Sequence, residues 1–212
     1  MRQLLIATLN AGKAREFREM LGDAAGPFAW TDLSRHPDVT QVEETGTTFL
    51  ANASLKATGY ARQLGVWALA DDSGLEVDAL GGSPGVSSAR WAKLHDAGEG
   101  DAANNALLLR QLQEVPDERR TGRFVCVLAL ADPDGRIILT ARDTAEGRVL
   151  RSPRGSGGFG YDPLFYVESL GKTTAELSPE EKHAISHRGK ALRRMRELME
   201  RAGLAGKSVR NA

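Results

Sequence analysis

Leu4-Leu5-Ile6-Ala7-Thr8-Leu9-Asn10-Ala11-Gly12-Lys13 is the stretch that decides the fold class of this chain. Its continuous apolar run, residues 4–7, is typical of a buried strand. A short loop of small and polar residues follows. A helix is predicted next, because apolar residues recur along one face: Ala14, Phe17, Met20 and Leu21. Strand, polar loop, helix is a common arrangement for presenting backbone N–H groups to a phosphate.

The rest of the chain continues this alternation and ends with a hairpin and further helices. Helices are predicted over residues 48–64 and 101–114, after a capping box at Ser178, and from about His187 onward. Strand patterns occupy four stretches: residues 67–70, 75–80, 123–131 and 136–141. The last two flank Asp132-Pro133-Asp134-Gly135, a strong hairpin signal.

Two stretches, residues 22–47 and 152–161, are rich in loop-forming residues. Early alternation of strands and helices followed by a hairpin indicates an α/β protein with a mixed sheet. We expect one domain over residues 1–212, with a frayed tail after about residue 203.

Composition narrows the class of protein. The 212 residues are 41% hydrophobic and 26% charged, which is ordinary for a globular protein. Lys plus Arg equals Asp plus Glu at 28 each, which argues against a dedicated nucleic-acid binder. The apolar run at residues 125–131 is far too short to cross a bilayer. We therefore expect no membrane partner. Cys126 is the only cysteine, so no intrachain disulfide can form, and we expect a buried thiol in a cytoplasmic protein.

The basic residues are unevenly spread. Residues 182–210 hold nine Lys or Arg against two acidic residues, Glu197 and Glu200. This is either a solvated helix face or, in part, a surface that faces a polyanionic ligand.

Asp71-Asp72-Ser73-Gly74 is the sharpest chemical signal. Two adjacent carboxylates at the end of an apolar strand cost desolvation and repulsion unless a cation or donors compensate. Mg²⁺ prefers such oxygen ligands, and Glu43-Glu44 could complete the site. The alternative is an Asx-type turn in which the aspartates cap backbone N–H groups, with Glu43-Glu44 merely solvated.

Three donors lie at the start of the first helix: Thr8, Asn10 and Lys13. Together with the helix dipole they suit an anion, although a capped helix that carries a lysine is also common. The spacing of a Walker A loop is absent.

Two later segments could bind a base. Gly157-Gly158-Phe159-Gly160-Tyr161-Asp162-Pro163 sets aromatics among glycines, which lets a ring lie flat on a base. The alternative is a tight turn with its aromatics in the core. Ser186-His187-Arg188, with Lys182 upstream, offers a cluster of donors or, equally, a helix start with surface charges.

Taken in order, these segments resemble the inosine triphosphate pyrophosphatase family, also called the dITP/XTP or non-canonical purine NTP pyrophosphatases. The resemblance runs from Leu4 to about Leu198. It rests on seven short blocks: residues 7–13, 43–49, 52–57, 70–75, 81–85, 157–163 and 186–189. Leu9 is the one departure, because the family more often has a small or polar residue there.

The resemblance implies an elongated, twisted mixed sheet flanked by helices, with two lobes and a deep active-site cleft between them. It also implies a homodimer that uses Mg²⁺ to hydrolyse ITP, dITP and XTP to the monophosphate and pyrophosphate. Asp72 is implied as the general base. The implied metal ligands are Glu43, Glu44, Asp71 and Asp72. The implied substrate-binding residues are Thr8, Leu9, Asn10, Ala11, Gly12, Lys13, Lys56, Ser73, Phe159, Gly160, Tyr161, Asp162, Lys182, His187 and Arg188.

Base selection is expected to follow hydrogen-bond matching. Hypoxanthine and xanthine carry a 6-oxo acceptor where adenine carries an amino donor, so a pocket of donors at Lys182, His187 and Arg188 favours the former. Two other functions stay open: a pyrophosphatase for modified pyrimidine or methylated nucleotides, and a non-catalytic nucleotide- or RNA-binding module that uses the basic C-terminal helix.

Overall fold

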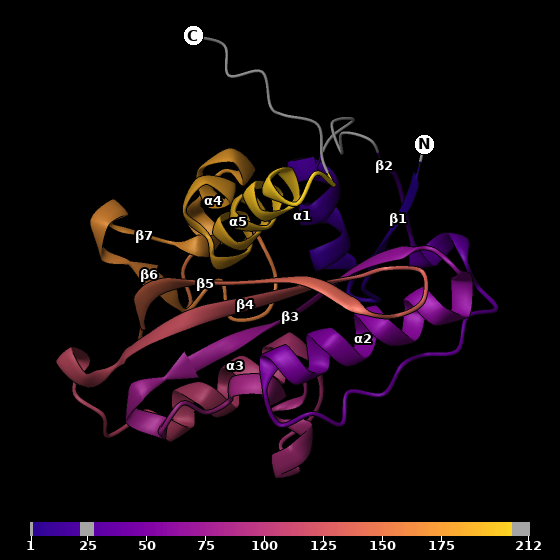
Figure 1. The fold of residues 1–212 in the computed structure, drawn as a ribbon. Helices are drawn as coiled ribbons and strands as arrows, with labels where there is room; N and C mark the ends of the chain where they lie inside the picture. Colours follow the sequence, from indigo (N-terminus) through magenta and orange to yellow (C-terminus); the bar gives the residue numbers. More distant parts are fainter. Residues whose placement is uncertain (1, 22–27, 205–212) are drawn as a thin grey trace, which may run out of the picture. The chain divides into compact units, whose positions relative to one another are not determined.

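The structure is a computed structural model that describes residues 2–21 and 28–204 (Figure 1). The predicted loop residues 22–27 and the tail from residue 205 lie outside the described residues. The helices are α1 (Ala11–Leu21), α2 (Phe49–Leu64), α3 (Gly100–Gln111), α4 (Pro179–Ile185) and α5 (His187–Arg201). The strands are β1 (Arg2–Ala7), β2 (Phe28–Asp32), β3 (Trp67–Val77), β4 (Thr121–Ala131), β5 (Ile137–Val149), β6 (Phe165–Val167) and β7 (Lys172–Thr173).

The strands form one mixed sheet in the order β2-β1-β3-β4-β5-β6-β7. β1 runs parallel to both β2 and β3, whereas β6 runs antiparallel to β5 and β7. The predicted α/β class with a mixed sheet is therefore confirmed. The predicted hairpin is confirmed too, because the N–H of Asp132 donates to the carbonyl of Arg136 at 3.0 Å across the turn.

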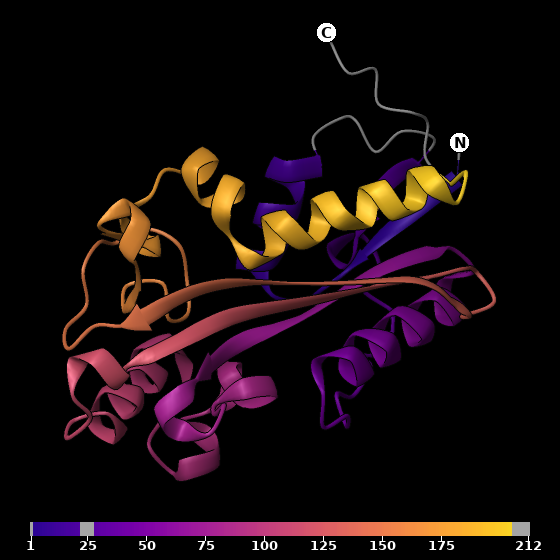
Figure 2. The same cartoon turned by 60° about the vertical axis from the view of Figure 1, so that its left-hand side comes forward.

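The contacts divide the chain into two compact units. One comprises Met1–Asp72, Val127–Arg142 and Ala191–Ala212, and the other comprises Ser73–Cys126 and Asp143–Lys190. In the first unit, α2 covers one face of the sheet, and α1 and α5 cover the other (Figures 1 and 2). Apolar strand residues fill the space between these helices: Leu4–Ala7, Ala68–Ala70 and Val127–Ala131 are all buried. On α5, Ala191, Leu192, Met195 and Met199 are buried as well.

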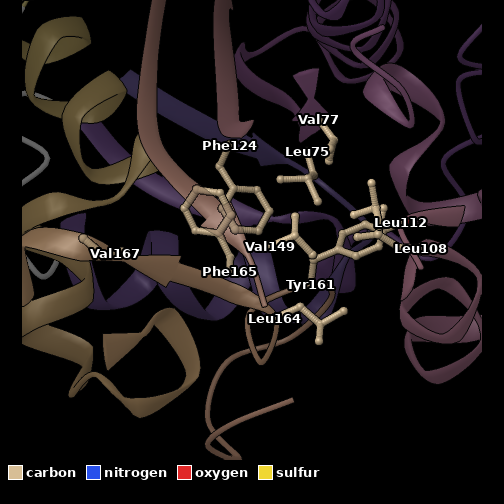
Figure 3. Packing of buried hydrophobic residues seen from close by; sticks show 10 residues of the cluster. All are labelled: Leu75, Val77, Leu108, Leu112, Phe124, Val149, Tyr161, Leu164, Phe165 and Val167. Carbon is tan, nitrogen blue, oxygen red and sulfur yellow. The ribbon is translucent and has the colours of Figure 1, made fainter. Parts of the chain in front are cut away.

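The second unit has its own apolar cluster, shown in Figure 3. Residues from α3 and its C-cap, four strands and the loop before β6 meet in it: Leu75, Val77, Leu108, Leu112, Phe124, Val149, Tyr161, Leu164, Phe165 and Val167. Arg120, only 2% exposed, joins several segments at the edge of this cluster. Its guanidinium donates to the carbonyls of Leu112, Val149 and Leu150 at 2.6 to 2.9 Å. Each of its three nitrogens therefore has a hydrogen-bond acceptor, although the side chain is buried.

The predicted break between two strands was wrong. Residues 67–70 and 75–80 were expected as separate strands around a turn at residues 71–74, but β3 is continuous from Trp67 to Val77. Asp, Ser and Gly favour turns locally, and here contacts distant in sequence override that preference. A Cβ on Gly74 would collide with the carbonyl of Gly85 and with Ser88, so this glycine serves a close approach and not a turn.

β2 falls within residues 22–47, which were expected to be loop. This strand is at the edge of the sheet and only its first and last residues, Phe28 and Asp32, are buried. Such a short strand lacks both the continuous apolar run and the alternation that predict strands.

Within the described part of the chain, no helix combines the length and the apolar character needed to cross a membrane.

Candidate active site

The acidic pair lies on β3 and is held by lysines from two helices. Asp71 and Asp72 are 1% and 5% exposed. Because successive side chains of a strand point to opposite faces, α1 supplies the partner of one and α2 the partner of the other. Lys13 Nζ lies 2.5 Å from Asp71 Oδ1, and Lys56 Nζ lies 3.0 Å from Asp72 Oδ1. Each carboxylate therefore has its own cation, a partner that the expected turn would not have supplied.

Lys56 joins Asp72 to a second carboxylate. Its Nζ also lies 2.7 Å from Glu44 Oε1, so one ammonium contacts two carboxylates. Asn52, one turn earlier on α2, donates from Nδ2 to Asp72 Oδ2 at 3.3 Å. The other end of the same amide accepts from the N–H of Gly46 at 2.8 Å, which ties the Glu44 loop to α2. Asn52 and Lys56 are four residues apart on α2, and their contacts bring Glu44 and Asp72 together.

Burial dominates the protonation of Asp72. Desolvation raises the pKa of this carboxyl above its ordinary value, more than the charges of Lys56 and Lys13 lower it. Burial also acts to lower the pKa of Lys56, but the negative charges of Asp72 and Glu44 outweigh it and the pKa is raised. Lys56 is therefore held as a cation.

The donors at the start of α1 lie where the sequence places them. Asn10 caps the helix, because its Oδ1 accepts from the N–H of Lys13 at 2.9 Å, and Thr8 Oγ1 accepts from the N–H of Asn10 at 3.2 Å. Thr8, Gly12 and Lys13 are partly buried, whereas Asn10, Ala11 and Leu9 are exposed, Leu9 by 61%. Residues 8–10 therefore form an accessible loop that leads into the first turn of α1.

The acidic groups are too few for a metal cage made of protein alone. Over residues 2–21 and 28–204, no group of three or more His, Cys, Asp and Glu side chains is arranged to hold a metal ion. Glu44 and Asp72 form a pair around Lys56, Asp71 is paired with Lys13, and Glu43 is exposed. One or two carboxylates are nevertheless what Mg²⁺ commonly uses when a phosphate and water complete its shell. The donor set fits such an ion at Glu44 and Asp72.

In the second unit, Asp162 organises the aromatic loop. Its Oδ2 accepts from the N–H of Phe159 at 2.8 Å and from Lys182 Nζ at 2.6 Å, while Oδ1 accepts from Thr174 Oγ1 at 2.8 Å. Gly158 has φ +73°, and a Cβ there would collide with this carboxylate. The side chain of Asp162 is 4% exposed and contacts both Phe159 and Lys182.

Cations lie over the Phe159 ring. Lys182 Nζ is 5.0 Å from the ring centroid, and Arg188 Cζ is 5.9 Å from it. Arg188 also donates to Ser73 Oγ at 2.7 Å, and the His187 ring stacks on Phe124 with centroids 4.9 Å apart. The structure thus brings Phe159, Asp162, Lys182 and Arg188 together from separate segments.

Tyr161 is the exception among the expected substrate-binding residues of this loop. Its ring lies in the apolar cluster (Figure 3), and its hydroxyl donates to the carbonyl of Ser88 at 2.9 Å. Burial raises the pKa of this phenol above its ordinary value. The side chain of Tyr161 is therefore part of the core of the second unit.

Two residues at these clusters were not assigned from the sequence. Asn52 had a usable signal, its spacing of four from Lys56, but Thr174 had none, because its contact with Asp162 depends on the tertiary fold.

Comparison with known proteins decides the family. The sequence model of the Ham1 family matches residues 4–198. The chain belongs to the Ham1 family. A relative from Desulforamulus reducens, named dITP/XTP pyrophosphatase, is 50% identical over 94% of this chain and 96% of that protein. One of the same name from Geobacillus kaustophilus is 51% identical over 94% of this chain and 95% of its own length.

Solved structures of Ham1 proteins have the same fold as this chain. The HAM1 protein from Coxiella burnetii has a TM-score of 0.83 at 40% identity, covering 95% of this chain and all of that one. The dITP/XTP pyrophosphatase from Mycobacterium abscessus has a TM-score of 0.71 at 42% identity, over 91% of this chain and 98% of that one. The expected family resemblance is confirmed over nearly the whole Ham1 chain.

Proposed function

We propose that this chain hydrolyses the non-canonical purine nucleoside triphosphates ITP, dITP and XTP to the monophosphate and pyrophosphate. The observation that carries the proposal is Lys56, held between Glu44 and Asp72, in a Ham1 chain whose relatives are named dITP/XTP pyrophosphatases. Cations next to buried carboxylates suit a reaction that must neutralise a triphosphate and direct a water.

The triphosphate is assigned to the loop at residues 8–10 and the first turn of α1, which carries Lys13, together with Lys56. The N–H groups at the start of α1 and the helix dipole favour an anion there. Lys13 and Lys56 already sit beside carboxylates, so a phosphate that enters competes with Asp71 and Asp72 for these ammonium groups.

Mg²⁺ is the proposed cofactor, with Glu44 and Asp72 as the protein ligands. When bound, the ion supplies charge neutralisation for the phosphates and makes the bridging phosphate oxygen a better leaving group. The small donor set supports this choice, because Mg²⁺ is usually shared between one or two carboxylates, the substrate and water.

Asp72 is the proposed general base. Asn52 and Lys56 fix its carboxylate from two directions, which holds it in one orientation for a water that attacks the α-phosphate. Attack there releases pyrophosphate, whereas attack on the γ-phosphate would release orthophosphate.

The base is assigned to the second unit's cluster. Phe159 offers a ring face between glycines, and its position is set by Asp162. Lys182, His187 and Arg188 are the proposed donors toward the 6-oxo group, and Ser73 orients Arg188. Adenine carries an amino donor at the same position, so these side-chain donors would have no acceptor there. Binding of adenine is therefore disfavoured.

The proposal includes a homodimer in the cytoplasm. The support for the homodimer is the family resemblance, and multi-angle light scattering of the purified chain measures it directly. The support for the cytoplasm is the single cysteine, which allows no intrachain disulfide.

Product analysis tests the proposed function. Wild-type protein with dITP and Mg²⁺ is expected to give dIMP and pyrophosphate in equal amounts by ³¹P NMR, and Asp72→Asn is expected to give neither at a comparable rate. Orthophosphate as the first product, or equal turnover by Asp72→Asn, would overturn it.

A further inference from the structure

The loop that carries Phe159 cannot hold its own shape. Gly158 and Gly160, on either side of Phe159, have φ +73° and +62°, and Gly157 lies before them. Glycines in this conformation lose much backbone freedom when ordered, so contacts from elsewhere must fix the loop. Asp162 fixes the side before the ring, through the N–H of Phe159.

Helix α3 fixes the other side. The N–H of Gly160 donates to Asp101 Oδ2 at 2.6 Å, and the carbonyl of Gly160 accepts from Asn105 Nδ2 at 2.9 Å. Asp101 and Asn105 are four residues apart, so they lie on one face of α3. Both polar groups of the Gly160 residue, which follows Phe159 directly, are thus bound by a single helix.

Helix α3 is itself firmly anchored. Leu108 and Leu112 pack with Tyr161 in the apolar cluster (Figure 3). Asn104, 2% exposed, accepts from the N–H of Ala92 at 2.8 Å and donates to the carbonyl of Ala89 at 3.1 Å. A helix held in this way can transmit a fixed position to the loop that it binds.

We propose that Asn105 and Asp101 are positioning residues for base recognition, which set the Phe159 ring by holding Gly160. Neither residue is part of the proposed catalytic or metal-binding set. The inference rests on the proposed function, because it requires that Phe159 stacks on the base.

The test is a double-mutant cycle on dITP hydrolysis with Asn105→Ala, Phe159→Ala and the double variant. Asn105→Ala is expected to raise KM about 5- to 10-fold, because part of the affinity supplied by stacking of the base on the aromatic ring is lost. The value of kcat is expected to stay within about twofold of wild type. When Asn105→Ala is added to Phe159→Ala, it is expected to change KM by less than about twofold, because the ring through which Asn105 acts is absent.

Conservative and control variants complete the experiment. Asp101→Ala is expected to raise KM, whereas Asp101→Asn keeps an oxygen acceptor for the Gly160 N–H and should stay near wild type. Arg110→Ala, exposed on the same helix, should change neither parameter. Asn105→Leu, which fills similar volume without a donor, replaces Asn105→Ala if thermal unfolding shows that the latter is unfolded.

Each result separates the two proposals. If the effects of Asn105→Ala and Phe159→Ala on KM multiply, the Asn105 contact does not act through the ring and the inference is wrong. If Phe159→Ala leaves KM unchanged, base stacking itself is wrong, and the inference falls with it, while pyrophosphate release from dITP would still stand.

Discussion

Lys56 lies 3.0 Å from Asp72 and contacts it from α2, a helix that packs on one face of the sheet, while Asp72 belongs to a central strand. Both side chains are less than a tenth exposed. A buried lysine that holds the proposed general base and also reaches Glu44 makes this pair the centre of the candidate site.

Asp72→Asn should abolish most turnover without unfolding the protein. The amide keeps the shape of the side chain but cannot accept the proton of the attacking water. We expect kcat for dITP to fall at least about 100-fold. Steady-state kinetics with a thermal melt measure both effects. Asp134→Asn in the exposed hairpin is the matched control and should behave as wild type; an active Asp72→Asn variant would remove Asp72 from the mechanism.

Lys56→Met should destabilise the fold as well as the reaction. It leaves the buried Asp72 carboxylate without its cation, a change that costs about 3 to 5 kcal/mol of the free energy of unfolding. Urea titration measures this loss. Adding Asp72→Asn should restore part of it, because the stranded charge is then removed. Lys93→Met breaks an exposed pair with Glu99 and should have no measurable effect. Equal losses at both lysines would contradict the account.

Much of this site follows from local sequence patterns, but its central element does not. The β1–α1 loop, α2 and the hairpin are predicted by apolar spacing and turn chemistry. The break wrongly predicted at residues 71–74 shows the limit, because four turn-forming residues stay in β3 through contacts with Lys13 and Lys56 and through close packing at Gly74. Asp101 and Asn105 left no signal, since they bind backbone 59 and 55 residues away.

Gly74→Ala should test the packing that keeps β3 straight. The added methyl group meets the carbonyl of Gly85 and the Ser88 side chain, and we expect the free energy of unfolding to fall by about 1 to 3 kcal/mol. Ser88→Ala added to this variant should not rescue it, because the Gly85 carbonyl still blocks the methyl group. A Gly74→Ala variant as stable as wild type would show that this segment has room to adjust.

Asp32 should make stability depend on pH in the acid range. Burial alone would raise the pKa of this carboxyl, but hydrogen bonds from Ser34 and the nearby Arg18 outweigh it and lower the pKa below its ordinary 3.8. The stabilisation is therefore complete above pH 3.8 and is lost as pH falls through the lower folded-state pKa.

Urea titrations of wild type and Asp32→Asn at several pH values measure this contribution. The difference in the free energy of unfolding between the two proteins should stay constant from about pH 6 to about pH 4 and shrink as pH falls below 3.8. The exposed Asp38→Asn serves as the control. A difference between wild type and Asp32→Asn that does not vary with pH would contradict the assignment.

The most direct test of the central claim is a panel of nucleotides assayed for pyrophosphate release by the wild-type protein with Mg²⁺. The account predicts kcat/KM values for ITP, dITP and XTP that exceed the value for ATP by about 100-fold or more, because adenine opposes the donors of the base cluster. Equal kcat/KM for ATP and ITP would contradict it.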